Sequence, residues 1–382
     1  MKRIRPDYYN LFTCTANQCP ITCCQEWKIS VDPDTYHQWK TLVPPKTISM
    51  PKSNLADYTI QKEDCTIISL NEQKKCPFLD EKKLCQLVTA YGDCVLSQTC
   101  KIFPRDVHVF DTHEEETMMP CCPAVIDLWN QKEILSFPED FENDSVLFQI
   151  RSAILHLIQN TKIPLEECLL EIFYILLELY RNEPVTTEMI EDYFSSATVR
   201  QLKSAIEEID LPILHTMEEC NELIQDLSVN YKKEGLYLSY LNPILSLAEQ
   251  ISEGYEQKDL QYQWESFYYE FSSFQSLLRN YLSNEIFSNL LMPDADLKDM
   301  IIQMQWIALE YTAIRQSLFL KWISDRSTSL KYETVRDYIV IISRMTGYEE
   351  DDIYEYLENS FQELIWDWGY FALILSHGND IK

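Results

Sequence analysis

The segment FENDSVLFQIRSAILHLIQN, residues 141–160, decides the fold class because the chain changes character there. Either Asp144 or Ser145 stands where the N-cap of a helix is expected. The apolar residues that follow recur at helical spacing, as the stripe Val146, Ile150, Ile154 and Leu157. We therefore expect an amphipathic helix here and helical structure from this point onward.

Similar helical patterns continue towards the C-terminal end. The chain has six glycines among its 382 residues, which leaves few flexible loops between them. A chain of this length usually needs more than one hydrophobic core, so we predict two domains. Residues 136–382 are expected to form an all-α array. Its further helices are expected at 164–182, 186–209, 240–255, 266–292, 297–324, 334–347 and 352–368.

The preceding part, residues 1–135, is rich in cysteine and poor in helical pattern. It holds eleven of the 13 cysteines, and CTANQCPITCCQEW, residues 14–27, contains four of them. Short β-like runs occur at 27–31 and 64–70, separated by turn-rich sequence. We predict a mainly α protein whose N-terminal domain binds a metal or cluster and contains little β structure.

The cellular compartment decides how these cysteines are interpreted. The N-terminal MKRIRPDYYNLF has no apolar core or cleavage site, so we do not expect a secretory signal. No run of about 18 apolar residues exists, so we expect no membrane span. We therefore expect a cytoplasmic protein, in which thiols stay reduced. A metal or cluster site is then favoured over a disulfide framework.

Three of the cysteines precede proline, namely Cys19, Cys76 and Cys122, as in ferredoxin-type cluster runs. Thiolates that lie close together repel one another unless a cation holds them. Zinc and iron–sulfur clusters both satisfy this requirement, and spacing does not decide between them. The adjacent Cys23 and Cys24 point in different directions, so one can bind a metal while the other serves a second site or packs.

Composition and missing motifs remove several function classes. The formal net charge of −29 argues against nucleic acid as a partner and favours a basic partner. The chain has no G-x-G-x-x-G or P-loop, so it supports neither a dinucleotide site nor an NTPase. H-E-x-x-H and G-x-S-x-G are also absent. The chemistry is therefore expected at the cysteines, although no catalytic residue can be assigned.

The cysteine blocks resemble a zinc- or iron-chelating CxxCxxCC family and, within it, the flagellin lysine-N-methylase family. The helical segments PLEECLL (164–170), YLSNEIF (281–287) and EYTAIR (310–315) echo weaker family patterns. The strongest matches are Cys14, Cys19, Cys23-Cys24 with Trp27, Cys76-Pro77, Cys85, Cys100 with Phe103-Pro104-Arg105, Glu115-x-Thr117, and Cys122-Pro123.

This resemblance implies S-adenosylmethionine-dependent methylation of lysines on flagellin, with a [4Fe–4S] cluster. Eight thiolates exceed the needs of one cluster, so some belong to a second site, such as zinc, or lie beside the ligands. Because no glycine-rich loop exists, we expect the cofactor to chelate an open cluster iron. The implied metal ligands are Cys14, Cys19, Cys23, Cys24, Cys76, Cys85, Cys100 and Cys122.

The chain departs from the family pattern at three positions. Cys121 stands where the family usually has serine, so Cys122 is the expected ligand and Cys121 the spare. Ala124 replaces a usual glutamate, and Glu26 stands where a radical-type CxxxCxxC run needs its last cysteine. The alternatives to a methylase are a non-catalytic zinc- or iron-binding interaction module and an electron-transfer or metal-handling protein.

Several residues near the cysteines have two possible roles. Arg105 can pair with Asp106 or bind a carboxylate such as that of S-adenosylmethionine. His108 and His113 are expected in exposed loops rather than as ligands, and Glu114–Glu116 in a solvated loop or an acidic rim for a lysine. Cys65 and Cys94 are expected to be buried or incidental thiols rather than ligands, and Trp27 and Phe103 are expected to shield a cluster.

Overall fold

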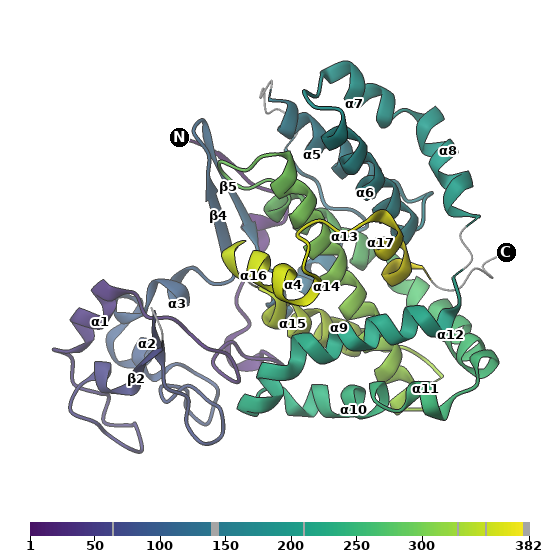
Figure 1. Cartoon of the computed structure of the whole chain (residues 1–382). Helices are drawn as coiled ribbons and strands as arrows, with labels where there is room; N and C mark the ends of the chain where they lie inside the picture. The colour runs from purple at the N-terminus through teal and green to yellow at the C-terminus, as the bar shows by residue number, and fades with distance from the viewer. Residues whose placement is uncertain (63–64, 139–144, 209–210, 327, 348–349, 377–382) are drawn as a thin grey trace.

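The computed structural model describes residues 1–62, 65–138, 145–208, 211–326, 328–347 and 350–376. Within these residues the fold is mainly helical, which confirms the mainly α part of the predicted fold class. Figure 1 shows the early, purple and blue part of the chain on one side of a large group of helices. Among the described helices, none is both long enough and apolar enough to cross a membrane.

The helix α14 (Leu297–Ser324) forms the centre of this group. Asp296 caps it by accepting a hydrogen bond from the Asp299 amide at 3.0 Å. Of its 28 residues, 24 are buried, so the helix is covered on all sides. Its packing partners are α6 (Leu165–Arg181), α9 (Ile213–Glu234), α10 (Leu238–Ala248), α12 (Gln257–Phe271), α13 (Gln275–Asn289), α15 (Tyr332–Thr346) and α17 (Trp368–Leu375).

Four predicted helices are confirmed to within about two residues at each end: α5 (Val146–Ile158), α6, α14 and α15. Ser145 stands at the N-cap of α5, and Asp144 lies outside the described residues. The helix α9 was not predicted. It ends at Gly235, whose φ of 72° is the left-handed conformation typical of a helix stop.

Four predicted helices have wrong limits. The stretch 186–209 contains two helices, α7 (Thr187–Tyr193) and α8 (Ser196–Ile206), and residue 209 lies outside the described part. The break occurs because the Ser195 hydroxyl accepts the Thr198 amide and caps a new helix. Likewise, a 3₁₀ turn separates α12 from α13 within 266–292, and α16 (Glu350–Phe361) stops short of residue 368. In 240–255, α10 is followed by the short α11 (Ile251–Gly254).

The strands form two small sheets. In the first, β1 (Lys2–Ile4) runs parallel to β5 (His113–Met118), and β4 (Arg105–Val109) runs antiparallel to β5. This sheet was not predicted. In the second, β2 (Thr59–Lys62) pairs with β3 (Cys65–Ile68), which lies within the predicted run 64–70. The predicted strand 27–31 makes only an isolated bridge, Ser30 to Ile67.

Buried apolar residues form two separate cores. The smaller core belongs to residues 24–102, which we call the cysteine lobe, and it includes α1 (Pro33–Trp39), α2 (Gln86–Tyr91) and α3 (Gln98–Ile102). Its centre contains Trp39 and Phe78, whose rings meet edge to face at 5.5 Å. The larger core defines the helical body, which also includes β1, the β4–β5 hairpin and α4 (Pro123–Asn130). The predicted division into independent units at residue 135 stays a prediction.

The N-terminal part of the chain and the rest of it also differ in net charge. Residues 1–103 contain 13 Lys and Arg against 11 Asp and Glu, whereas residues 104–382 contain 19 against 50. The acidity of the chain therefore lies almost entirely after the cysteine lobe. A cationic partner is expected to be attracted to the helical body rather than to the lobe.

Candidate cysteine site between the lobe and the helical body

Thiols from three segments of the chain lie close to one another. Burial raises the pKa values of Cys19, Cys76 and Cys85, and the nearby Cys23 raises each of them further. Burial likewise raises the pKa of Cys100 to about 11 and that of Cys122 to about 12, again with a contribution from Cys23. Such electrostatic influence acts over short distances. The segments 19–24, 76–100 and 121–122 therefore meet around Cys23.

The adjacent thiols of Cys23 and Cys24 act directly on each other's pKa values. A hydrogen bond with the Cys24 thiol holds the pKa of Cys23 below its usual range, with help from the Arg344 guanidinium and against the effect of burial. The same hydrogen bond, followed by burial, raises the pKa of Cys24. Cys23 is therefore the thiol best prepared to act as a thiolate, the form that binds metals.

Helix termini position several of the other cysteines. Cys85 and Cys122 are the N-cap residues of α2 and α4, and Cys100 lies in the first turn of α3. The Ser97 hydroxyl caps α3 by accepting the Cys100 amide at 3.2 Å. Free backbone amides at a helix start stabilise a thiolate. Here they lower the pKa values of Cys85 and Cys122, although burial outweighs them.

Arg344 of α15 joins the cysteine segments to the helical body. Its guanidinium donates to the carbonyls of Cys121 at 3.0 Å, Ile21 at 2.9 Å and Thr22 at 3.4 Å. The same group lies over the ring of Trp27, 4.9 Å from its centroid. Because one buried cation holds both the 21–22 and the 121 backbone, Arg344 fixes how these two segments face each other.

The predicted metal ligands and the other cysteines differ in how exposed they are. Cys14 is exposed, and its sulfur accepts a hydrogen bond from the Ala16 amide at 3.4 Å. Cys121, the expected spare, is buried beside Arg344. The two cysteines expected to be incidental, Cys65 and Cys94, are exposed. Trp27 and Phe103 pack edge to face at 4.9 Å, in line with a shielding role.

The chemistry of the gathered donors can be tested against a metal. Sulfur donors suit zinc and iron–sulfur clusters, and they do not suit magnesium or calcium. As the side chains stand, no group of three His, Cys, Asp or Glu residues in the described ranges is placed to hold a metal ion. By composition the donor set fits a thiolate-bound centre, and the described side chains are not arranged as one.

Arg105 does not pair with its neighbour as expected. Asp106 instead contacts His108 at 2.9 Å, with Oδ2 as the partner of Nε2. The Arg105 guanidinium lies over the rings of Tyr9 and Phe12, at 5.8 and 5.5 Å from their centroids. Within the described residues it makes no ion pair with a carboxylate. The role of Arg105 in cofactor binding stays a prediction.

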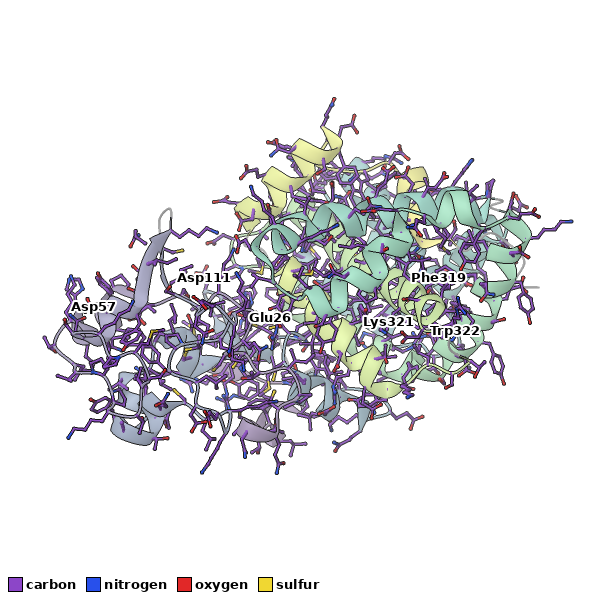
Figure 2. The ribbon with its side chains drawn as sticks, turned by 90° about the horizontal axis from the view of Figure 1, so that it is seen from below. Glu26, Asp57, Asp111, Phe319, Lys321 and Trp322 are labelled. Atoms are coloured by element: carbon purple, nitrogen blue, oxygen red, sulfur yellow. The ribbon has the colours of Figure 1, made fainter. Side chains whose placement is uncertain are left out.

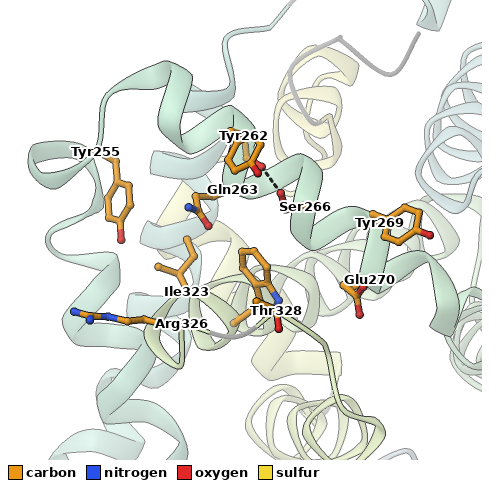
Figure 3. Close-up of a pocket in the computed structure, with 10 residues that line it drawn as sticks. Tyr255, Tyr262, Gln263, Ser266, Tyr269, Glu270, Ile323, Arg326 and Thr328 are labelled. Carbon is orange, nitrogen blue, oxygen red and sulfur yellow. Dashed lines mark hydrogen bonds between the residues drawn. The ribbon is translucent and has the colours of Figure 1, made fainter.

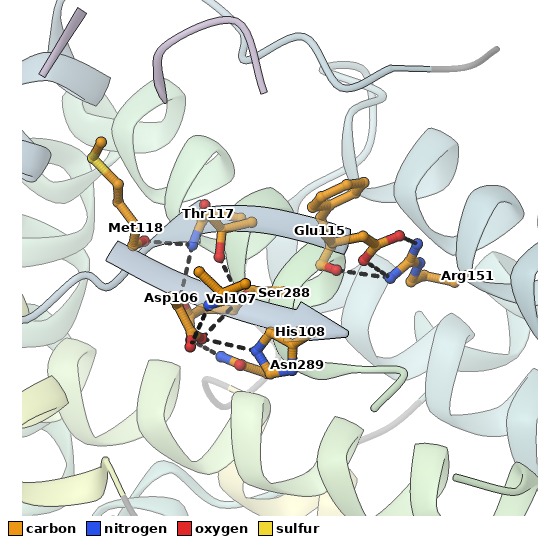
Figure 4. A network of polar contacts seen from close by, with 12 residues as sticks. Asp106, Val107, His108, Glu115, Thr117, Met118, Arg151, Ser288 and Asn289 are labelled. Carbon is orange, nitrogen blue, oxygen red and sulfur yellow. Dashed lines mark hydrogen bonds and ion pairs between the residues drawn. The ribbon is translucent and has the colours of Figure 1, made fainter. Parts of the chain in front are cut away.

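The expected loop around His108, His113 and Glu114–Glu116 is wrong, because these residues form the β4–β5 hairpin (Figure 4). Both histidines are buried, and His113 Nε2 lies 3.1 Å from Glu115 Oε1. A solvated polar run was the natural interpretation of this sequence. The hairpin instead places the histidines and these carboxylates in ion pairs and hydrogen bonds, of which the His113–Glu115 contact is buried.

Arginines distant in the sequence neutralise the acidic run. Arg151 of α5 binds both oxygens of Glu115, at 2.7 and 2.5 Å. Arg5 pairs with Glu116 at 2.8 Å, and Arg3 with Glu114 at 3.0 Å. An acidic rim that waits for a substrate lysine is therefore not present at Glu114–Glu116. These carboxylates join the first strand and α5 to the hairpin instead.

Sequence reasoning missed a buried acid network beside the cysteines. Tyr281 and Ser343 each donate to Glu310 at 2.6 Å, so the two family-like segments 281–287 and 310–315 meet here. Burial raises the pKa of Glu285 well above its usual range, with Glu310 adding to the effect. Burial raises the pKa of Cys121, and both carboxyl groups raise it further. The sequence signal that could have revealed this network is the presence of acidic residues inside apolar helices.

Comparison with known proteins places the chain in a family. Residues 151–374 match the family model described as FliB lysine N-methylase C-terminal domain. The flagellar biosynthetic protein FliU of Salmonella muenchen is 26% identical over 156 residues, which cover 37% of this chain and 86% of that protein. No solved structure matches the chain.

Two further relatives are named for their activity. A lysine-N-methylase of Salmonella choleraesuis is 24% identical over 169 residues, and one of Salmonella typhimurium is 25% identical over 169 residues. In each case the match spans 40% of this chain and 40% of the relative. The family model, by contrast, covers more than half of this chain. The chain therefore belongs to the FliB lysine N-methylase family.

Proposed function

We propose that the protein is a protein-lysine N-methyltransferase that transfers methyl groups from S-adenosylmethionine to lysine side chains of flagellin. The observation that carries this proposal is the family match over residues 151–374. Two matching relatives are named lysine-N-methylase and a third is named a flagellar biosynthetic protein. In the reaction, a methyl group replaces a proton on the lysine amine, and S-adenosylhomocysteine and the proton leave.

The reaction centre in this proposal is the cysteine site. Cys19, Cys23, Cys24, Cys76, Cys85, Cys100 and Cys122 supply the thiols around it, and Cys14 lies in the loop just before them. A [4Fe–4S] cluster in such a site supplies a redox-active, Lewis-acidic iron centre. Zinc is the corresponding alternative for a second set of thiols. Arg344 keeps the segments in register, and Trp27 and Phe103 exclude water from one side.

The acid network supplies a way to handle protons. A lysine reaches the enzyme as an ammonium and must lose a proton before its nitrogen can accept a methyl group. Glu310 accepts hydrogen bonds from Tyr281, Ser343 and Thr346, so it stays a paired acceptor. Glu285 lies next to this group, and burial raises its pKa well above the usual range, with Glu310 adding to the effect. We assign the pair to proton transfer between the cysteine site and the interior.

The compartment and partner follow from the same features. Thiols that must bind a metal need a reducing environment, so we place the reaction in the cytoplasm. The 50 carboxylates against 19 cations in residues 104–382 suit a substrate that presents ammonium groups. A nucleic-acid substrate is disfavoured for the same reason.

The test is methyl transfer by the purified protein. We expect anaerobically prepared protein with S-adenosylmethionine and flagellin to add methyl groups to lysine, as detected by mass spectrometry of flagellin peptides. Cys100→Ala is expected to lose the activity, and Cys65→Ser, which changes an exposed thiol, to keep it. Metal-loaded protein that neither methylates flagellin nor binds S-adenosylmethionine in calorimetry would leave the non-catalytic interaction module as the better account.

A further inference from the structure

A second feature of the helical body is an aromatic groove between α12 and the C-terminal end of α14 (Figure 3). The cavity has a volume of 630 Å³. Tyr262 and Tyr269 are 68% and 78% exposed, which is unusual for large aromatic side chains. They lie seven residues apart, so they share one face of α12. Trp322 of α14 lines the groove and is buried.

The groove and the cysteine site lie in different parts of the molecule. In Figure 2, Phe319, Lys321 and Trp322 stand on one side of the molecule, Asp57 stands at the opposite end, and Glu26 lies between them. Along α14, Trp322 follows Glu310 by 12 residues, which is about 18 Å of helix. Glu26 follows Cys24 by two residues, so its label marks the position of the cysteine site. A side chain held in the groove is therefore not the one that reacts at the cysteine site. The groove is a separate surface within the family-matched region.

The lining favours a cationic segment with an apolar stem. The faces of tyrosine and tryptophan rings attract ammonium groups and pack well against methylene chains. Glu270 adds a carboxylate to the wall. Arg326 also lines the groove, but Figure 3 shows its guanidinium at the edge beside Tyr255, away from Glu270. A lysine side chain matches this combination of ring faces and carboxylate.

Charge on a larger scale agrees with the local lining. The helical body contains most of the 50 carboxylates of residues 104–382, and α12 itself contains Asp259, Glu265 and Glu270. A positively charged segment is therefore attracted to this side of the molecule before any contact forms. Gln263, Ser266 and Thr328 line the same groove and offer hydrogen bonds to an extended backbone.

We propose that this groove is a docking site that binds a lysine-containing segment of the protein substrate, separate from the place of methyl transfer. The identity of that substrate as flagellin rests on the proposed function. A docked segment raises the local concentration of neighbouring lysines near the enzyme. The groove then affects how tightly the whole protein binds and leaves the chemical step unchanged.

The test compares substitutions that remove or keep the ring faces. The double variant Tyr262→Ala/Tyr269→Ala is expected to weaken binding of monomeric flagellin about tenfold in calorimetry. Tyr262→Phe/Tyr269→Phe keeps both ring faces and is expected to bind like the wild type. Tyr180→Ala, which removes an exposed tyrosine of α6 outside the groove, serves as the matched control. Equal affinity of the Ala double variant and the wild type would overturn the proposal.

Enzyme kinetics provide a second, independent test of the docking site. The Ala double variant is expected to raise KM for flagellin while kcat is unchanged, and to leave methylation of a short lysine peptide unaffected. A fall in kcat for that peptide would assign the groove to the reaction centre and overturn the docking role. If the wild type binds flagellin without methylating it, the proposed function fails, and the binding comparison still decides the groove. No binding of flagellin by the wild type would overturn the docking site.

Discussion

The cysteine lobe and the helical body are stabilised in different ways. Deep in the body, charged groups are paired, as Arg315 with Glu166 at 3.3 Å and Arg151 with Glu115 at 2.5 Å. In the lobe, a small core carries thiols whose pKa values burial raises, and the adjoining Cys23 is influenced by Arg344, a cation of the body. The body therefore has a large core with paired charges, whereas the lobe has a small core beside the thiols that we propose bind a metal.

Removal of the metal should produce the largest difference in stability between the cysteine lobe and the helical body. Binding of a structural metal by thiolates is worth about 10–16 kcal/mol in small domains, so we expect a chelator to unfold the cysteine lobe and leave the body folded. Hydrogen exchange should show loss of amide protection in α2 and α3, with α14 still protected. Equal protection of α2 with and without metal would show that the lobe folds on its own core.

The paired body should in turn be sensitive to the loss of one charge. Arg315 is 1% exposed and also donates to the carbonyls of Ile374 and Leu375. Arg315→Ala leaves Glu166 buried without its cation, so we expect the body to lose about 3–5 kcal/mol in denaturant unfolding. Arg181→Ala breaks an exposed pair with Glu178 and should change stability by less than about 0.5 kcal/mol. Similar losses for both variants would argue against a charge-paired interior.

The junction between the two regions can be loosened without removing a charge. Arg344→Lys keeps the cation but cannot reach the carbonyls of Cys121, Ile21 and Thr22 together, so we expect a cost of about 2 kcal/mol at the junction. Metal release should then occur at lower denaturant, with little change in the unfolding of the body. Arg336→Lys alters a part-buried pair on the same helix and is the matched control. Identical metal release in both variants would contradict the role of Arg344.

One buried carboxyl of the body lacks a partner and predicts a pH dependence. Both oxygens of Glu171 are buried without a hydrogen bond among the described residues, and burial raises its pKa to about 8. The folded state therefore holds this proton more tightly than the unfolded state. The contribution of Glu171 to folding stability is fully present below pH about 4.5 and is lost as the pH rises to about 8. Over this range the free energy of unfolding falls by at most about 1.4 kcal/mol per pH unit.

The variant Glu171→Gln tests this dependence because it cannot ionise. Its stability between pH about 5 and 8 should fall less steeply than that of the wild type, as measured by denaturant titration at each pH. Parallel curves for the two proteins would mean that Glu171 is solvated or paired in solution. Glu178→Gln, a change at a part-exposed position of the same helix, should follow the wild-type curve.

The sequence predicts the parts of the structure that depend on local pattern. Apolar periodicity is enough for α5, α6, α14 and α15, and the cysteine motifs indicate the convergence of thiols. The sequence does not predict the β4–β5 hairpin, because that hairpin depends on arginines such as Arg151 from another part of the chain. Arg344 was missed for the same reason, since its partners lie more than 200 residues away. Long-range charge pairing leaves no local signal.

The central claim is that the three cysteine segments hold one iron–sulfur centre, and metal analysis of anaerobically purified protein tests it most directly. We predict a coloured protein that contains about four iron atoms and about four acid-labile sulfides per chain. Cys100→Ala should lose both, and Cys65→Ser should keep both. Colourless protein that holds only zinc, or iron content that is the same in Cys100→Ala and the wild type, would contradict the account.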